Sequence, residues 1–189
     1  LTLDSALAQE TRPAPDWPAG WTAAWSAPGA ELRPLQILHG VPQGQANPAA
    51  MTALKDLGLG GIVCNVAFND YLVSEPNWVT LVKAIEACHE VGLLAWIYDE
   101  KGYPSGSAGG LVLKENPAYE ALALAYDPTR PDPFVIRPSY EHTHASNNFH
   151  AARRYINLID TKAVGGFINK THEAYRQRLE THFGTTIPA

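Results

Sequence analysis

The residues WIYDEKGYPSGSAGG, numbers 96–110, join an apolar strand to a polar loop. The apolar run begins at Leu93 and ends at two adjacent carboxylates, Asp99 and Glu100, and a loop rich in glycine, proline and serine follows. Many α/β enzymes present acidic groups from the end of a buried strand in this way. The alternative is a strand that ends in a polar turn because it has reached the solvent-exposed surface. Because function concentrates on shaped loops, the pattern favours a site here.

The region before this loop alternates between expected strands and expected helices. Apolar runs predict strands over residues 35–38, 61–66 and 93–98, with helices over residues 48–57 and 77–91 between them. Asn47 and Pro48 form an N-cap and first-turn pair, and Gly58 and Gly92 supply the helix stops. Successive strands start 26 and 32 residues apart (35, 61, 93). This cadence predicts repeated βα units and a parallel sheet covered on both faces.

The rest of the chain is expected to be less regular. We expect a short helix over residues 117–125, a functional insertion over residues 127–157 and a final helix from an N-cap at Asp160 to Gly184. That helix would turn a set of apolar side chains inward: Val164, Phe167, Ile168, Tyr175 and Leu179. A β-like start over residues 185–189 follows, so we expect the domain to be truncated before its sheet is complete.

Residues 1–32 are interpreted as an N-terminal arm, distinct from the domain over residues 33–189. We expect Trp17, Trp21 and Trp25, four residues apart, to seal an open edge or end of that domain. A carbohydrate-stacking platform is the alternative. Ala6–Leu7–Ala8 resembles the end of a signal peptide, which favours export, although an ordinary short tail fits too.

Composition excludes several classes of function. The chain has 189 residues, 46% hydrophobic and 17% charged, which suits one globular domain. Its net charge of −5 argues against nucleic-acid binding. No apolar run approaches the roughly 18 residues of a membrane span, so we expect no membrane insertion. Cys64 and Cys88 are expected to be buried thiols, with a single bridge between them as the alternative in an exported protein.

Two parallel α/β architectures fit the cadence. A doubly wound nucleotide-binding fold should carry G-x-G-x-x-G after its first strand, but residues 39–44 read HGVPQG. Polar residues instead follow every strand: His39 the first, Asn65 and Asp70 the second, Asp99 and Glu100 the third. In a (β/α)8 TIM barrel these positions converge on one face, where active sites lie. We therefore predict the barrel, ending after about three βα units and a further helix.

Several segments carry a resemblance to a known family. YDEKGYPSGSAGG (98–110), ENPAYEA (115–121), YINLID (155–160) and FINKTHEAYRQRL (167–179) are similar to bacterial TIM-barrel glycoside hydrolase-like proteins related to the α-L-rhamnosidase type. The resemblance spans residues 33–187. It implies a sugar site, and a further strand ending in an acidic motif as a candidate catalytic position. It also implies that the remaining barrel strands belong to the same parent chain.

We therefore predict a glycoside hydrolase-like protein that acts on or binds a carbohydrate and is inactive as this chain alone. Most glycosidases use two carboxylates about 5–5.5 Å or about 6.5–9.5 Å apart. Adjacent strand residues point to opposite sides, so Asp99 and Glu100 are not expected to form the pair. Either one would be the first member, with its partner on another strand.

The expected substrate-binding residues are His39, Asn65, Asp70, Tyr103 and Ser105. No cofactor and no metal are predicted. Two alternatives stay open: a non-catalytic carbohydrate-binding protein, and a metal-dependent hydrolase centred on His142 and His144.

Overall fold

The structure is a computed structural model that describes residues 16–101, 105–141 and 153–188. It is a mixed α/β protein built around a three-stranded parallel sheet of order β1-β2-β3, with β1 at Leu35–Leu38, β2 at Gly61–Cys64 and β3 at Leu94–Ile97. Leu35 lies opposite Gly61, which lies opposite Leu94. The predicted strands and their parallel order are confirmed, although β2 and β3 are each two residues shorter than expected.

Helices α2 (Pro48–Asp56) and α3 (Glu75–Val91) connect the strands, and their ends follow the predicted signals. The Asn47 side chain accepts a hydrogen bond from the Ala50 N–H, with Pro48 in the first turn. Gly92 ends α3 in the left-handed conformation. The structure starts α3 two residues earlier than predicted, at a Ser74 N-cap.

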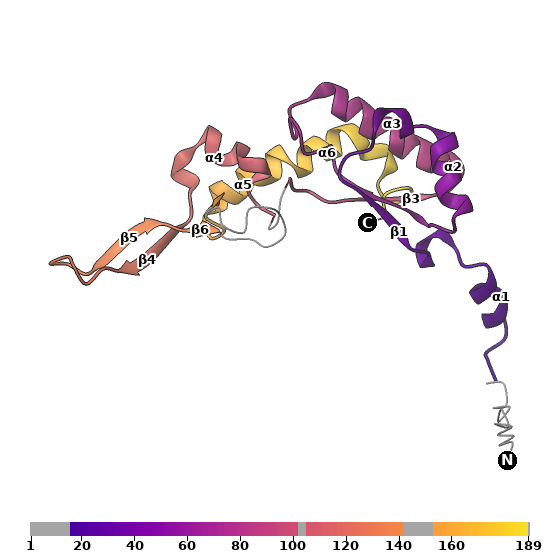
Figure 1. Ribbon diagram of the computed structural model, residues 1–189, viewed down its shortest axis with the longest axis horizontal. Helices are drawn as coiled ribbons and strands as arrows, with labels where there is room; N and C mark the ends of the chain where they lie inside the picture. Colours follow the sequence, from indigo (N-terminus) through magenta and orange to yellow (C-terminus); the bar gives the residue numbers. More distant parts are fainter. Residues whose placement is uncertain (1–15, 102–104, 142–152, 189) are drawn as a thin grey trace, which may run out of the picture.

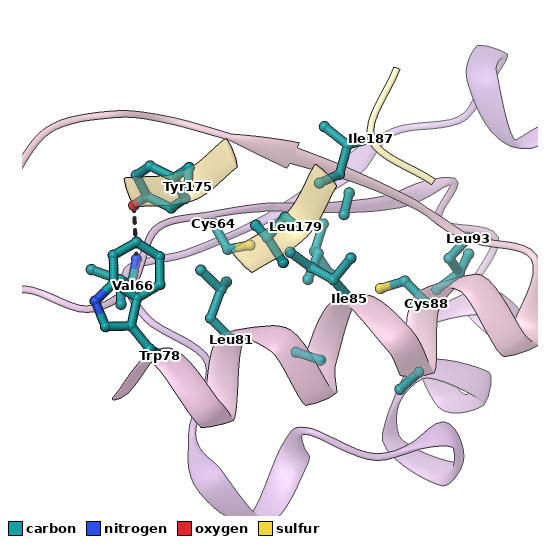
Figure 2. Close-up of a cluster of buried hydrophobic side chains, with 14 of the residues drawn as sticks. Cys64, Val66, Trp78, Leu81, Ile85, Cys88, Leu93, Tyr175, Leu179 and Ile187 are labelled. Carbon is teal, nitrogen blue, oxygen red and sulfur yellow. Dashed lines mark hydrogen bonds between the residues drawn. The ribbon is translucent and has the colours of Figure 1, made fainter. Parts of the chain in front are cut away.

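The main core lies between one face of the sheet and helices α2, α3 and α6 (His172–Leu179) (Figure 2). Ile62, Cys64 and Ala95 are the buried sheet residues on this face. Tyr175 and Leu179 of α6 pack among them, and the Tyr175 hydroxyl accepts a hydrogen bond from the Val66 N–H at 3.1 Å. Helix α6, although distant in sequence, therefore shares the hydrophobic core of the first βα units.

The opposite face of the sheet is open in the part of the chain that the structure describes. Ile37, Val63 and Trp96 lie in one row across the three strands, and the side chains of Ile37 and Trp96 are 59% and 46% exposed. The expectation of a sheet covered on both faces is thus wrong for the described residues. Alternation along each strand explains the pattern, because neighbouring residues point to opposite faces.

The final helix is broken rather than continuous. Asp160 caps α5 (Thr161–Lys170) as predicted, but the backbone is distorted at Thr171 (φ −105°, ψ −78°), where α5 ends, and α6 begins at His172. Phe167, Tyr175 and Leu179 are buried as expected, whereas Ile168 is exposed. Phe167 joins a second, smaller core with Ile156 and with helix α4 (Leu111–Glu115). The break lets α5 serve this second core while α6 serves the first.

The predicted helix over residues 117–125 is wrong. A short 3₁₀ turn, Pro117–Tyr119, is followed by strand β4 (Leu122–Tyr126), which pairs antiparallel with β5 (Phe134–Pro138). A further short pair, β6 (Tyr140–Glu141) and β7 (Arg153–Arg154), completes the expected insertion. Cross-strand pairing with residues outside the 117–125 window overrides the helix preference of its Ala and Leu residues.

The N-terminal arm does not seal the domain. Trp21 lies in α1 (Trp21–Ser26), which extends away from the sheet, and Trp17 stacks on Trp21 at 5.3 Å (Figure 1). Trp25 is 87% exposed, so the predicted sealing role is wrong. The possible signal-peptide end at Ala6–Leu7–Ala8 lies outside the described residues. Among the helices that are described, none has the length and apolar character to cross a membrane.

Candidate functional site

Side chains from the ends of all three parallel strands meet at one edge of the sheet. His39 follows β1, Phe68 follows β2 and Tyr98 follows β3. The His39 Nδ1 atom lies 2.6 Å from the Tyr98 hydroxyl, and the His39 ring stacks on Phe68 with centroids 4.9 Å apart. Burial raises the pKa of Tyr98 to about 12. Of the polar residues that were expected to converge at the strand ends, His39 contacts the aromatic rings of Phe68 and Tyr98.

The loop after β2 is held in an uncommon backbone geometry beside this cluster. Ala67, Asp70 and Leu72 all have positive φ, which costs non-glycine residues free energy. Gly40, also at positive φ, approaches Ala67 so closely that a β-carbon there would lie 2.8 Å from the Ala67 Cβ. The loops after β1 and β2 are therefore tightly fitted at this edge, as is common where backbone strain serves a site.

Glu100 is buried and points into the loop that follows it. Its carboxylate accepts hydrogen bonds from five backbone N–H groups, those of Lys101, Gly106, Ser107, Ala108 and Gly109. Successive N–H groups that converge on one anion form a backbone nest. Here the anion is the chain's own carboxylate, so Glu100 fixes the shape of the loop.

Asp99 points away from Glu100, as the extended backbone predicts. Its Oδ1 atom accepts a hydrogen bond from the Ser105 hydroxyl at 2.6 Å, and its Oδ2 atom lies 3.3 Å from Nε2 of His172. The other ring nitrogen of His172 lies 3.0 Å from the Thr171 hydroxyl. Thr171 is buried and donates to the Phe167 carbonyl, so the α5–α6 junction orients the imidazole toward Asp99.

Asp99 and His172 stand at one end of a groove of about 880 Å³. The groove is lined by residues 96–99, by α6 residues with the following Glu180, and by Phe183, Ile187 and Pro188. Within the groove Arg176 pairs with Glu173 at 2.9 Å and with Glu180 at 3.1 Å. Its guanidinium is therefore committed to the chain's own carboxylates. The groove offers hydroxyl-binding groups and aromatic surface, which suit a neutral polyhydroxyl ligand better than a phosphate.

Four predicted binding residues do not line this groove: His39, Asn65, Asp70 and Ser105. His39 contacts Tyr98 and Ser105 contacts Asp99, whereas the other two lie farther from it. Asn65 is completely buried, and its amide donates to the Glu100 carbonyl and accepts from the Ala67 N–H, both at 3.2 Å. It links the ends of β2 and β3 beneath the site. Asp70 is exposed in the turn before α3, where its carbonyl accepts from the Val73 and Ser74 N–H groups. Neither side chain lines the groove.

Tyr71, in the loop after β2, is buried. Its hydroxyl has no hydrogen-bond partner among the described residues, and burial, followed by the nearby Tyr175, raises its pKa. Tyr103, His142 and His144 lie outside the described residues. Within the described ranges, no cluster of His, Cys, Asp or Glu has the arrangement of a metal site. Cys64 and Cys88 are free, buried thiols, as predicted.

The geometry limits the chemistry of the site. Ser105 donates to the Asp99 carboxylate, and among the described residues its hydroxyl is not paired with a histidine as in a Ser–His nucleophile. His172 is not among the predicted site residues, because the apolar spacing of residues 160–184 predicts one continuous helix and gives no sign of the α5–α6 junction that orients His172. The arrangement supplies one oriented carboxylate, an imidazole and aromatic rings.

Comparisons of the chain with protein-family models, with curated proteins and with solved structures give no match.

Proposed function

We propose that the chain is part of a glycoside hydrolase-like protein with a (β/α)8 barrel, and that it binds a carbohydrate at the carboxyl ends of its parallel strands. The observation that carries this proposal is Asp99, a carboxylate held at the end of β3 by Ser105 and faced by His172 in an aromatic groove. The resemblance of residues 98–110 to sugar-cleaving barrels points to the same residues.

The placement of the helices supports a barrel rather than a doubly wound sheet. Helices α2, α3 and α6 all pack against one face of the sheet, whereas a doubly wound fold places helices on both faces. The open face carries a row of apolar side chains, Ile37, Val63 and Trp96. Inward-pointing apolar side chains of this kind fill the interior of a closed barrel.

The edge of β3 supports a further parallel strand. The Ala95 N–H donates to the Thr186 carbonyl at 2.8 Å, while the adjacent Leu94 N–H donates to Gly60 on the β2 side. This alternation is the hydrogen-bonding pattern of an inner strand of a parallel sheet. A strand that continues this alignment would occupy the part of the groove beside residues 96–98, so the carbohydrate would bind beyond this strand, at Asp99 and His172.

Within this proposal the two carboxylates have different roles. Asp99 acts on the substrate, as one member of the acid pair, and Glu100 holds the loop that carries Ser105. The second catalytic carboxylate comes from the remaining barrel strands, because hydrolysis of a glycosidic bond needs two. His39, Phe68 and Tyr98 bind the sugar ring, since aromatic faces stack on sugars and an imidazole hydrogen-bonds their hydroxyls.

Binding of aryl glycosides tests the site in this chain. We expect saturation-transfer NMR with a panel including p-nitrophenyl α-L-rhamnoside to show contact, and Asp99→Asn to weaken binding at least about tenfold, the loss of one charge-assisted hydrogen bond. Asp56→Asn, an exposed acid at the end of α2, is the matched control. In the complete protein, Asp99→Asn should lower kcat at least about 100-fold. Unchanged binding and turnover in Asp99→Asn would refute the proposal.

A non-catalytic carbohydrate-binding protein is the second candidate, and the contacts of Glu100 favour it. Five backbone N–H groups bind the Glu100 carboxylate, so Asp99 is the one of these two adjacent acids that faces the groove. Aryl glycoside binding that depends on Asp99, without turnover in the complete protein, would select this alternative.

A further inference from the structure

The β4–β5 hairpin presents a continuous apolar face to solvent. Cross-strand pairing places Leu122 opposite Pro138, Leu124 opposite Ile136 and Tyr126 opposite Phe134. Residues two apart on a strand share a face, so all six side chains lie on the same side of the hairpin. The five large ones, all but Pro138, are 60–67% exposed.

The hairpin projects from the end of the molecule opposite α1 (Figure 1). Its exposed fractions mean that no other element of the described residues covers this face. A two-stranded hairpin is marginally stable by itself in water and needs a surface against which to pack. The Tyr126 and Phe134 rings contact each other at 5.5 Å, but this contact leaves both rings largely exposed.

The area of the face fits an interface between two copies. A large apolar side chain spans roughly 150–250 Å², so five of them at this exposure offer on the order of 600 Å². Two copies would bury on the order of 1,200 Å², the lower end of the range for specific interfaces. The face also lies at the upper end of the roughly 300–600 Å² that the largest apolar patch on a typical monomer covers, and such patches are often functional.

The pattern of residues is self-complementary. The face carries no charged side chain, because Arg137 projects from the other side of β5 and Asp127 and Asp132 lie in the turn. A two-fold axis through the Leu124–Ile136 pair would place each copy's central pair against the same pair of its partner. The Tyr126 and Phe134 rings of one copy would then cover Leu122 and Pro138 of the other copy.

We propose that the chain forms a two-fold symmetric dimer through the exposed apolar face of the β4–β5 hairpin. Two hairpins packed face to face make a small two-layer sandwich, in which each hairpin gains the packing surface that it lacks alone. The proposal is independent of the carbohydrate site, because none of the hairpin residues lines the groove.

Sedimentation equilibrium of the full chain tests this proposal. We expect the weight-average mass to rise from 20.5 kDa toward twice that value across the micromolar range. Ile136→Lys should raise the dimer dissociation constant at least about tenfold, because it buries a charge at the centre of the interface. Ile159→Lys, the same change at an exposed isoleucine outside the hairpin, is the matched control and should leave it unchanged.

Two further variants separate this interface from other apolar surfaces. Ile37→Lys, on the open sheet face, should leave the dimer intact. If Ile37→Lys abolished the dimer and Ile136→Lys retained it, the proposal would be overturned. Leu124→Cys should cross-link two copies on mild oxidation, because the two thiols would meet near the axis, and Cys64 and Cys88 are buried. A chain that remains monomeric at high micromolar concentration, or no cross-link in Leu124→Cys, would also overturn it.

Discussion

Replacing Glu100 with Gln tests whether this carboxylate anchors the loop. The Oε2 atom accepts three N–H groups at 3.1–3.2 Å and the Oε1 atom accepts two at 2.7 and 2.8 Å. Glutamine has the same shape but only one acceptor oxygen. If that oxygen takes the Oε2 position, the new NH₂ group faces the N–H groups of Lys101 and Gly109, which are also donors. Two hydrogen bonds are lost and replaced by contacts between donors.

The size of the effect follows from these contacts. A hydrogen bond to a charged group contributes about 1.5–3 kcal/mol, and the two lost bonds bracket a loss of about 3–6 kcal/mol. Lys101 is exposed and Gly109 is also accessible, so water can recover part of this loss. We therefore expect Glu100→Gln to lower the free energy of unfolding by about 3 kcal/mol. For a chain of this length the melting temperature should fall by about 6–12 °C.

Urea denaturation measures this difference as a lower midpoint at unchanged slope. Asp99→Asn is the matched control, because it changes the neighbouring carboxylate, whose two contacts, the Ser105 hydroxyl and the half-exposed His172, are both partly solvated. It should cost less than about 1 kcal/mol. Amide hydrogen exchange should also accelerate at Gly106 and Ala108, whose N–H groups are buried donors to Glu100. A Glu100→Gln variant as stable as Asp99→Asn would refute the anchoring role.

Three further predictions concern the buried thiols and two glycines. Burial raises the pKa of both Cys64 and Cys88 from about 9 to about 12, with Cys88 adding to the shift of Cys64. Their contribution to stability is complete below about pH 9 and is lost as the pH rises toward 12, because the thiols of the unfolded chain release protons that the folded chain keeps. A urea midpoint that does not change between about pH 9 and about pH 12 would contradict this prediction. Gly106→Ala should destabilise the chain by about 1–3 kcal/mol, because φ there is +140° and the new β-carbon would lie 2.6 Å from the Tyr155 hydroxyl oxygen. Gly165→Ala, inside α5 with open space around it, should instead stabilise by up to about 1 kcal/mol in the same unfolding assay.

Features set by neighbouring residues could be predicted from the sequence. Asn47, Pro48 and Gly92 act through hydrogen bonds and dihedral angles within one helical turn, so their roles follow from residue type and position. The parallel order of the strands followed from the spacing of apolar runs, because a βα unit needs a helix between parallel neighbours.

Features set by distant residues could not be predicted in this way. Residues 122–126 read LALAY, and Leu and Ala are strong helix formers, yet pairing with residues 134–138 makes them a strand. The break at Thr171 is similarly invisible in the helical period of residues 160–184. It depends on two separate cores, one that takes Phe167 and one that takes Tyr175.

The two carboxylates of the opening loop show where prediction from sequence ends. Extended backbone requires Asp99 and Glu100 to point apart, and they do. Which of them faces the groove is decided by the N–H groups of residues 106–109, which can satisfy only a carboxylate that points into their loop. Once Glu100 occupies that nest, Asp99 must face His172, a residue that the break at Thr171 brings to the end of β3. The loop that made both acids conspicuous therefore also separates them: it binds the Glu100 carboxylate and leaves the Asp99 carboxylate facing the groove.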